Sequence, residues 1–180
     1  LTAFEKAIEL DPTNSQWWVA KGHALETQKR YEQALHAYDK AIEFNPQNLA
    51  AWNNKGNVFR ENGKYIKAIN AYNKALELNS SDFEAWNNRG IDLGLLGNYD
   101  EALRSFQNAV ALNESYAEAW YNMGVIYDFK GERYTAVQAY KRATQIDPSY
   151  QNAWETRNAN TEMIMRNSIT CSSNPQIILV

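Results

Sequence analysis

Tryptophan returns every 34 residues along this chain, at Trp18, Trp52, Trp86, Trp120 and Trp154. A glycine follows four residues after each of the first four tryptophans, at Gly22, Gly56, Gly90 and Gly124. An aromatic residue recurs in the second half of each unit, at Tyr38, Tyr72, Phe106 and Tyr140. A fixed interval of this size is the sequence signature of a repeat protein, in which one small structural unit is stacked several times.

Each unit is expected to contain two helices. Apolar residues at unit positions 4, 8 and 11, and again at 20, 24 and 27, have helical spacing, and Gly63, Gly97 and Gly131 mark a turn between the two stretches. Glycine inside a helix costs roughly 1 kcal/mol relative to alanine, so its return at position 8 indicates that the helices must approach closely there. One helix pair cannot bury its apolar face alone, and stacking of neighbours builds a solenoid.

The pattern of Trp, Gly, Ala, Tyr or Phe, Ala and Pro resembles that of the tetratricopeptide-repeat (TPR) proteins over roughly residues 1–166. The resemblance implies an all-α fold, a right-handed superhelical solenoid of antiparallel helix pairs. We expect the second helix of a truncated repeat at 1–14, complete repeats at 15–48, 49–82, 83–116 and 117–150, a capping helix at 151–166, and a flexible, apolar-ended tail at 167–180. The sequence starts inside a helical pattern without Met, so we expect the natural chain to continue upstream.

Positions 2, 6, 9 and 13 of each first helix lie opposite its apolar positions, and in TPR proteins this face lines the concave groove. Position 6 is asparagine in three successive units, at Asn54, Asn88 and Asn122. An amide side chain has a donor and an acceptor, so it can bracket a peptide group. The column resembles the asparagine ladder in the superhelix of O-linked N-acetylglucosamine transferase. The alternative is that asparagine is simply a solvated residue at this position.

The same face also carries apolar residues in its second half. Exposed apolar patches usually mark binding sites, although neighbouring first helices can also bury positions 9 and 13 against each other. The predicted ligand is an extended peptide or partner segment with apolar side chains. The predicted peptide-binding residues are Asn54, Asn57, Asn88, Asn122, Ile91, Leu95, Tyr121, Val125, Phe129 and Met163.

Two further features bear on the partner. Acidic residues near the groove disfavour strongly acidic peptides; they are Glu61, Glu84, Glu118 and Asp128. The tail ends in four apolar residues, Ile177 to Val180, and is long enough to reach a groove in cis or in trans. The alternative function is therefore self-assembly, with chains joined through solenoid ends or through this tail.

Composition excludes several other functions. The formal net charge is −3 and no Lys/Arg cluster occurs, which disfavours nucleic acid and anionic membranes as partners. No apolar run is long enough to span a bilayer. A single cysteine, Cys171, rules out an internal disulfide framework and indicates a reducing cytosol. Because no catalytic grouping, metal-spaced ligand set or phosphate loop is found, the sequence predicts a cytoplasmic, non-catalytic scaffold without cofactor or metal.

Overall fold

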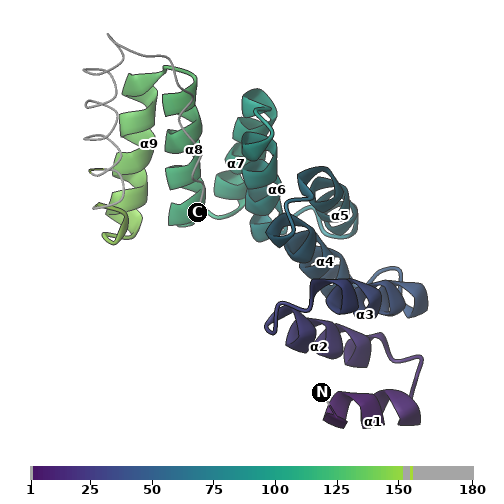
Figure 1. Ribbon diagram of the computed structural model, residues 1–180. Coiled ribbons are helices and arrows are strands. Elements are labelled where there is room, and N and C mark those ends of the chain that lie inside the picture. The colour runs from purple at the N-terminus through teal and green to yellow at the C-terminus, as the bar shows by residue number, and fades with distance from the viewer. Residues whose placement is uncertain (1, 152–154, 156–180) are drawn as a thin grey trace. The chain divides into compact units, whose positions relative to one another are not determined.

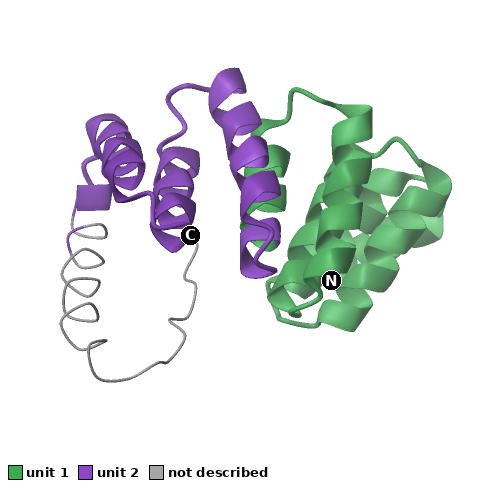
Figure 2. Cartoon of the chain, turned by 90° about the horizontal axis from the view of Figure 1, so that it is seen from above, with its two compact units in different colours: residues 1–92 green, residues 93–180 purple. Residues whose placement is uncertain are grey.

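A computed structural model of the chain describes residues 2–151 and 155, and these residues form helices without a strand (Figure 1). The helix bounds are Thr2–Leu10 for α1, Ser15–Glu26 for α2, Tyr31–Phe44 for α3, Leu49–Glu61 for α4, Tyr65–Leu78 for α5, Phe83–Leu95 for α6, Tyr99–Leu112 for α7, Ala117–Phe129 for α8 and Arg133–Ile146 for α9. The chain divides into two compact units, residues 1–92 and 93–180 (Figure 2). The boundary between them falls inside α6.

The first helix of each predicted repeat begins at the repeat's first residue, since α2, α4, α6 and α8 start at positions 15, 49, 83 and 117. Polar side chains cap three of these helices by accepting a backbone N–H, as is usual at helix N-termini. Asn14 accepts from Gln16 N at 3.1 Å, and Asn48 accepts from Ala51 N at 3.1 Å. The side chain of Asp82 caps the start of α6 in the same way, by accepting a backbone N–H. Helices then pack as pairs, α2 with α3, α4 with α5, and α8 with α9.

The turn between the paired helices requires a left-handed backbone. Gly63, Gly97 and Gly131 have φ values of 67°, 79° and 78°, and Lys29 has a φ of 58° at the equivalent position of the first complete repeat. A residue with a Cβ pays roughly 1–2 kcal/mol in this conformation, which explains glycine at the other three turns. Lys29 is therefore the strained member of the series.

The helix-interior glycines let the paired helices touch. A Cβ added at Gly56 would lie 2.5 Å from Cε1 of Tyr72, and the same holds for Gly22 against Tyr38. Both tyrosine side chains are fully buried. The predicted packing role of these glycines is therefore confirmed in the second and first complete repeats, and Gly124 makes the equivalent approach in the fourth.

Unit position 10 forms the seam between successive repeats in unit 1. Val58 of α4 joins a buried cluster with residues of the preceding repeat, which are Leu25, Ala34, Ala37 and Tyr38. The same position is occupied by Ala24, Asp92 and Ile126 in the other repeats. An acid thus stands once in a position that is otherwise apolar.

Candidate functional site

The predicted asparagines differ in how much of their surface is exposed. Asn54 and Asn57 of α4 and Asn88 of α6 are partly exposed, and all three belong to unit 1. Asn122 of α8 has 0% of its surface exposed. The expectation that Asn122 presents a free side chain to a ligand therefore differs from the structure, and its position 6 is not equivalent to that of the other two repeats.

Arg60 ties two of the asparagines together at the C-terminal end of α4. Its Nη1 donates to Asn88 Oδ1 at 2.9 Å, and its Nη2 donates to Asn57 Oδ1 at 3.3 Å. Its Cζ lies 5.8 Å from the centre of the Tyr72 ring, and the Tyr72 hydroxyl donates to Asn57 Oδ1 at 2.7 Å. We call Asn57, Arg60, Tyr72 and Asn88 the Arg60 cluster.

The Arg60 cluster is rich in donors and carries a positive charge. Both amide oxygens are occupied by Arg60, so the side chains of Asn57 and Asn88 are left with their Nδ2 groups, which donate to no other described residue. Arg60 itself pairs with amide oxygens and forms no ion pair within the described part of the chain. A guanidinium has five N–H donors and no acceptor. The cluster is therefore suited to acceptor groups, namely peptide carbonyls or a carboxylate.

Arg60 has the opposite charge to the residues at the same position of the first and fourth repeats. Unit position 12 is acidic in the first and fourth repeats, where Tyr38 donates to Glu26 at 2.7 Å and Tyr140 donates to Asp128 at 2.7 Å. In both cases the tyrosine hydroxyl points at a carboxylate. In the second repeat the acid is replaced by Arg60, which shifts the acceptor role to an asparagine.

The hydroxyls of Tyr38 and Tyr72 keep their protons. Burial raises the pKa of Tyr38 well above its ordinary value, and the Glu26 carboxylate raises it further, while the amide of Asn54 acts in the opposite direction. Burial also raises the pKa of Tyr72, against the effect of Arg60. Both hydroxyls therefore act as hydrogen-bond donors at any physiological pH.

Asp92 is a buried acid beside this cluster. Its side chain has 0% of its surface exposed, and neither carboxylate oxygen has a hydrogen-bond partner among the described residues. Burial raises the pKa of Asp92 to about 7, and the guanidinium of Arg60 opposes that rise. An ionised carboxylate without a partner is costly in a protein interior. The carboxyl group is consequently poised between its two protonation states near neutral pH.

The predicted apolar residues are less exposed than the sequence implies. Ile91 exposes 6% of its surface, Tyr121 7% and Val125 0%. Val125 and Tyr121 belong to a core cluster of unit 2 that also contains Tyr140, so they support packing. At position 9, Ile91 and Val125 are both buried, and Val125 packs against residues of α9, the second helix of its own repeat.

Two apolar residues of the predicted site remain partly exposed in unit 2, namely Leu95 and Phe129. The Phe129 ring stacks on Tyr99, with centroids 5.9 Å apart and an interplanar angle of 15°. Met163 and the tail at 167–180 lie outside the described residues. Glu61 and Glu84 of the predicted acidic rim are exposed, Glu118 is partly exposed, and Asp128 accepts a bond from Tyr140.

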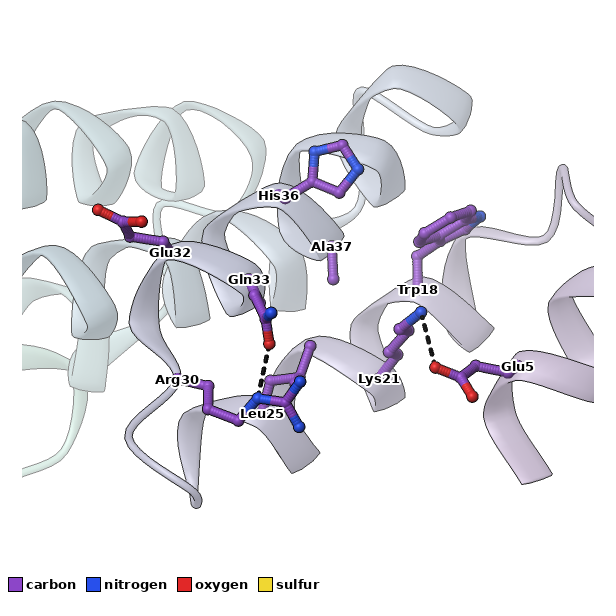
Figure 3. Close-up of a pocket in the computed structure, with 9 residues that line it drawn as sticks. All are labelled: Glu5, Trp18, Lys21, Leu25, Arg30, Glu32, Gln33, His36 and Ala37. Carbon is purple, nitrogen blue, oxygen red and sulfur yellow. Dashed lines mark hydrogen bonds and ion pairs between the residues drawn. The ribbon is translucent and has the colours of Figure 1, made fainter. Parts of the chain in front are cut away.

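Figure 3 shows a pocket of about 370 Å³ in unit 1, lined by residues of α1, α2, α3 and the loop before α3. Its basic groups are held by neighbours. Lys21 Nζ lies 3.4 Å from Glu5 Oε1 and 5.8 Å from the centre of the Trp18 ring, and Arg30 Nε donates to Gln33 Oε1 at 2.6 Å. None of the predicted site residues lines this pocket, and its two basic and two acidic residues give the lining no net charge.

Sequence reasoning missed Arg60, Tyr72 and Asp92. It examined positions 2, 6, 9 and 13, whereas these residues stand at positions 12, 24 and 10. A comparison of each position across the repeats would have found two of them, because Arg60 is the one basic residue at position 12 and Asp92 the one acid at position 10.

The described part of the chain has neither a metal-ligand cluster nor a membrane-spanning helix. No group of three or more His, Cys, Asp or Glu side chains there is arranged to hold a metal ion. None of the helices described has the length and hydrophobicity that crossing a bilayer requires.

Comparison with known families and structures agrees with this architecture. The family described as TPR repeat matches residues 56–91 and 95–131, and families described as tetratricopeptide repeat match residues 15–48 and 117–150, and 37–70. No curated protein sequence matches the chain.

Solved structures share the fold. A crystal structure of MamA is similar with a TM-score of 0.77 and 20% identity, over 84% of this chain and 88% of that chain. MamA 41-end from Desulfovibrio magneticus RS-1 is similar with a TM-score of 0.75 and 18% identity, over 81% of this chain and 82% of that chain. At these identities the likeness concerns the fold alone. Together with the family matches, it establishes that this chain belongs to the tetratricopeptide-repeat family and folds as an all-α TPR solenoid.

Proposed function

We propose that this protein is a non-catalytic scaffold whose α4 and α6 bind an extended segment of a partner protein. Tetratricopeptide repeats support a protein-interaction role in general. The finer proposal is that Asn54 and the Arg60 cluster hold the backbone of the segment. The proposed compartment is the cytoplasm, with no cofactor and no nucleic acid or membrane partner.

The Arg60 cluster is the observation that carries this proposal. A guanidinium on a groove-facing helix is expected to be neutralised by a carboxylate or fully solvated, yet Arg60 is fixed by two amide oxygens and the face of Tyr72. This arrangement holds the guanidinium in place without cancelling its charge. Charge-assisted hydrogen bonds to a carbonyl or a carboxylate are stronger than neutral ones. A pre-ordered donor set of this kind lowers the entropy lost when a segment binds.

Apolar side chains of the partner are proposed to contact unit 2. Leu95 and Phe129 are the predicted apolar residues that keep exposed surface there, and Phe129 is held by its stacking on Tyr99. Tyr121 and Val125 are proposed to support this surface from the core, and Asn122 to contribute through packing.

The test begins with peptides selected from a random library on the 180-residue protein. The affinity of the best peptide is then measured by calorimetry for the wild type, Arg60→Gln and Asn88→Ala. We expect each variant to weaken binding by about tenfold, which corresponds to loss of one charge-assisted hydrogen bond. Asn70→Ala on the exposed face of α5 is the matched control and should leave the affinity unchanged.

Stability must hold for the comparison to be valid, so each variant's thermal unfolding is followed by circular dichroism. If Arg60→Gln and Asn88→Ala both bind the selected peptide like the wild type while folding normally, the proposed contact is wrong. Asn122→Ala is not a suitable probe, because a fully buried side chain reports on packing as well as on binding.

Self-assembly through a solenoid end is the second candidate, and α1 favours it. No residue of α1 is buried, and Leu10 exposes 87% of its surface. Trp17 exposes 38% at unit position 3, where Ala51, Ala85 and Ala119 are buried. Sedimentation of the wild type, Trp17→Ala and a chain lacking residues 167–180 tests this. A concentration-independent monomer for the wild type would exclude assembly, whereas an oligomer lost in either variant would locate its contact.

A further inference from the structure

Packing alone does not explain why an acid, Asp92, is buried beside the Arg60 cluster. Ala24, Val58 and Ile126 show that position 10 accepts apolar side chains of several sizes. Asp92 instead places two unpartnered carboxylate oxygens in the seam between repeats. Buried polar atoms are nearly always hydrogen-bonded, so an exception in a native fold calls for an explanation.

The surroundings of Asp92 in unit 1 contain one opposing charge. From α4, Arg60 acts on the carboxyl group, and from α5 the Tyr72 hydroxyl lies within electrostatic reach. Glu26 of α2 and Glu61 of α4 act on that same hydroxyl. On α6 itself, Arg89 donates from Nε to Asn73 Oδ1 at 2.8 Å. Asp92 and the Arg60 cluster are therefore coupled electrostatically through Arg60.

We propose that Asp92 is a proton-linked regulator of the Arg60 cluster, so that a partner carboxylate binds Arg60 more tightly when Asp92 is protonated than when it is ionised. This inference rests on the proposed function, because it requires the Arg60 cluster to bind a ligand. With Asp92 protonated, the pair of Arg60 and Asp92 has a charge of +1. With Asp92 ionised, the pair is neutral, and an arriving carboxylate also meets a second negative charge.

Reciprocity follows from thermodynamic linkage. If protonation of Asp92 strengthens carboxylate binding, then carboxylate binding raises the proton affinity of Asp92 by the same factor. Binding therefore takes up a proton near neutral pH. A segment bound only through its carbonyl groups would show a much weaker effect, since it brings no net charge.

The probe is acetyl-glycyl-glycine, which has one free carboxylate, compared with its C-terminal amide. Titrations are followed through the side-chain amide NMR signals of Asn57 and Asn88 at constant ionic strength, at pH 6 and pH 8. The probe's carboxylate is ionised at both values, so any change in affinity comes from the protein. We expect the affinity at pH 6 to exceed that at pH 8 by about fivefold.

Asp92→Asn isolates the effect. Histidines commonly titrate in the same interval, and this variant keeps His23 and His36 while removing the acid. Its affinity for the probe should be the same at both pH values. Lys64→Gln, which removes an exposed cation of unit 1, should keep the wild-type pH dependence.

The outcomes separate the two proposals. If the probe binds equally at pH 6 and pH 8, or if Asp92→Asn retains the wild-type pH dependence, the regulatory role is overturned while binding at the Arg60 cluster stands. If neither the probe nor its amide perturbs Asn57 or Asn88 at either pH, the proposed function fails, and the regulatory role fails with it. A loss of binding in Arg60→Gln that spares Lys64→Gln assigns the contact to Arg60.

Discussion

Replacement of Asp92 should make the protein more stable, and increasingly so as the pH rises. Asp92→Asn removes the titrating group with little change of shape, and Asp92→Val gives position 10 the residue type that Val58 provides in the preceding repeat. The folded-state pKa of about 7 lies above the ordinary value of 3.8. Below its ordinary pKa the carboxyl group is protonated in both the folded and the unfolded state, and it then costs no stability. As the pH rises from there to about 7, the unfolded state loses the proton first, so the free energy of unfolding falls.

The magnitude follows from the interval between the two pKa values. Above pH 7 the ionised Asp92 lowers the free energy of unfolding by about 4 kcal/mol relative to the fully protonated state. About 2.5 kcal/mol of that loss falls between pH 5 and pH 8. The difference in stability between the wild type and Asp92→Asn should therefore grow by about 2.5 kcal/mol in favour of the variant over this interval.

Urea unfolding at pH 5 and pH 8 measures this difference, with circular dichroism and tryptophan fluorescence recorded together. Coincident transitions are needed, because stacked repeats can unfold in steps. Asp100→Asn is the control. Lys130 donates to Asp100 at 2.7 Å and lowers its pKa, so Asp100 stays ionised across this interval and its replacement should shift stability equally at both pH values. If the gap between the wild type and Asp92→Asn does not widen from pH 5 to pH 8, the carboxyl group is not buried and unpaired as described.

Three further predictions concern packing, turn strain and capping. Gly56→Ala should lower stability by about 1–3 kcal/mol, although alanine is the better helix former, because its Cβ would meet the Tyr72 ring; an unchanged melting temperature would contradict this. Lys29→Gly should raise the free energy of unfolding by about 1 kcal/mol, because glycine adopts a φ of 58° without strain, whereas Lys29→Ala should not raise it. Equal urea midpoints for the two variants would refute the predicted strain. Asn48→Ala should lower the free energy of unfolding in urea by about 1–2 kcal/mol, because it loses the cap of α4 and the 3.0 Å bond to Ser15 Oγ. Asn48→Asp should keep the cap. Equal losses of stability in the two variants would show that the cap contributes little.

The fold could be predicted from the sequence because stacking imposes the same demand on every repeat. A glycine facing a tyrosine ring and a glycine at three of the four turns recur at 34-residue intervals, so each instance supports the others. Lys29 shows the limit of this reasoning, since its left-handed turn follows from its place in the repeat although its residue type disfavours it.

The site could be predicted only in part, because burial differs between positions that look equivalent in sequence. Asn54 and Asn88 keep exposed surface, whereas Asn122 at the same position has none. Helical periodicity gives the direction in which a side chain leaves its own helix, but it does not say what lies opposite. Arg60 was not predicted as a site residue for a related reason. Its long side chain crosses from position 12 to reach Asn88 on the following first helix, which a face-by-face assignment does not anticipate.

The third complete repeat departs from the common pattern in a way that argues for function over packing. A chain selected only to stack its repeats would place an apolar residue at position 92, as it does at Val58 and Ile126. Valine there would avoid a cost of several kcal/mol at neutral pH, a large share of the stability of an ordinary domain. Such a cost is usually tolerated where a buried ionisable group serves a site, and Arg60, the charge that acts on Asp92, is itself the one basic residue at position 12. Two departures from a repeat pattern that act on each other electrostatically are hard to explain as independent accidents of packing. Their coupling gives Asp92→Asn two separable effects, greater stability at pH 8 and the loss of pH-dependent carboxylate binding.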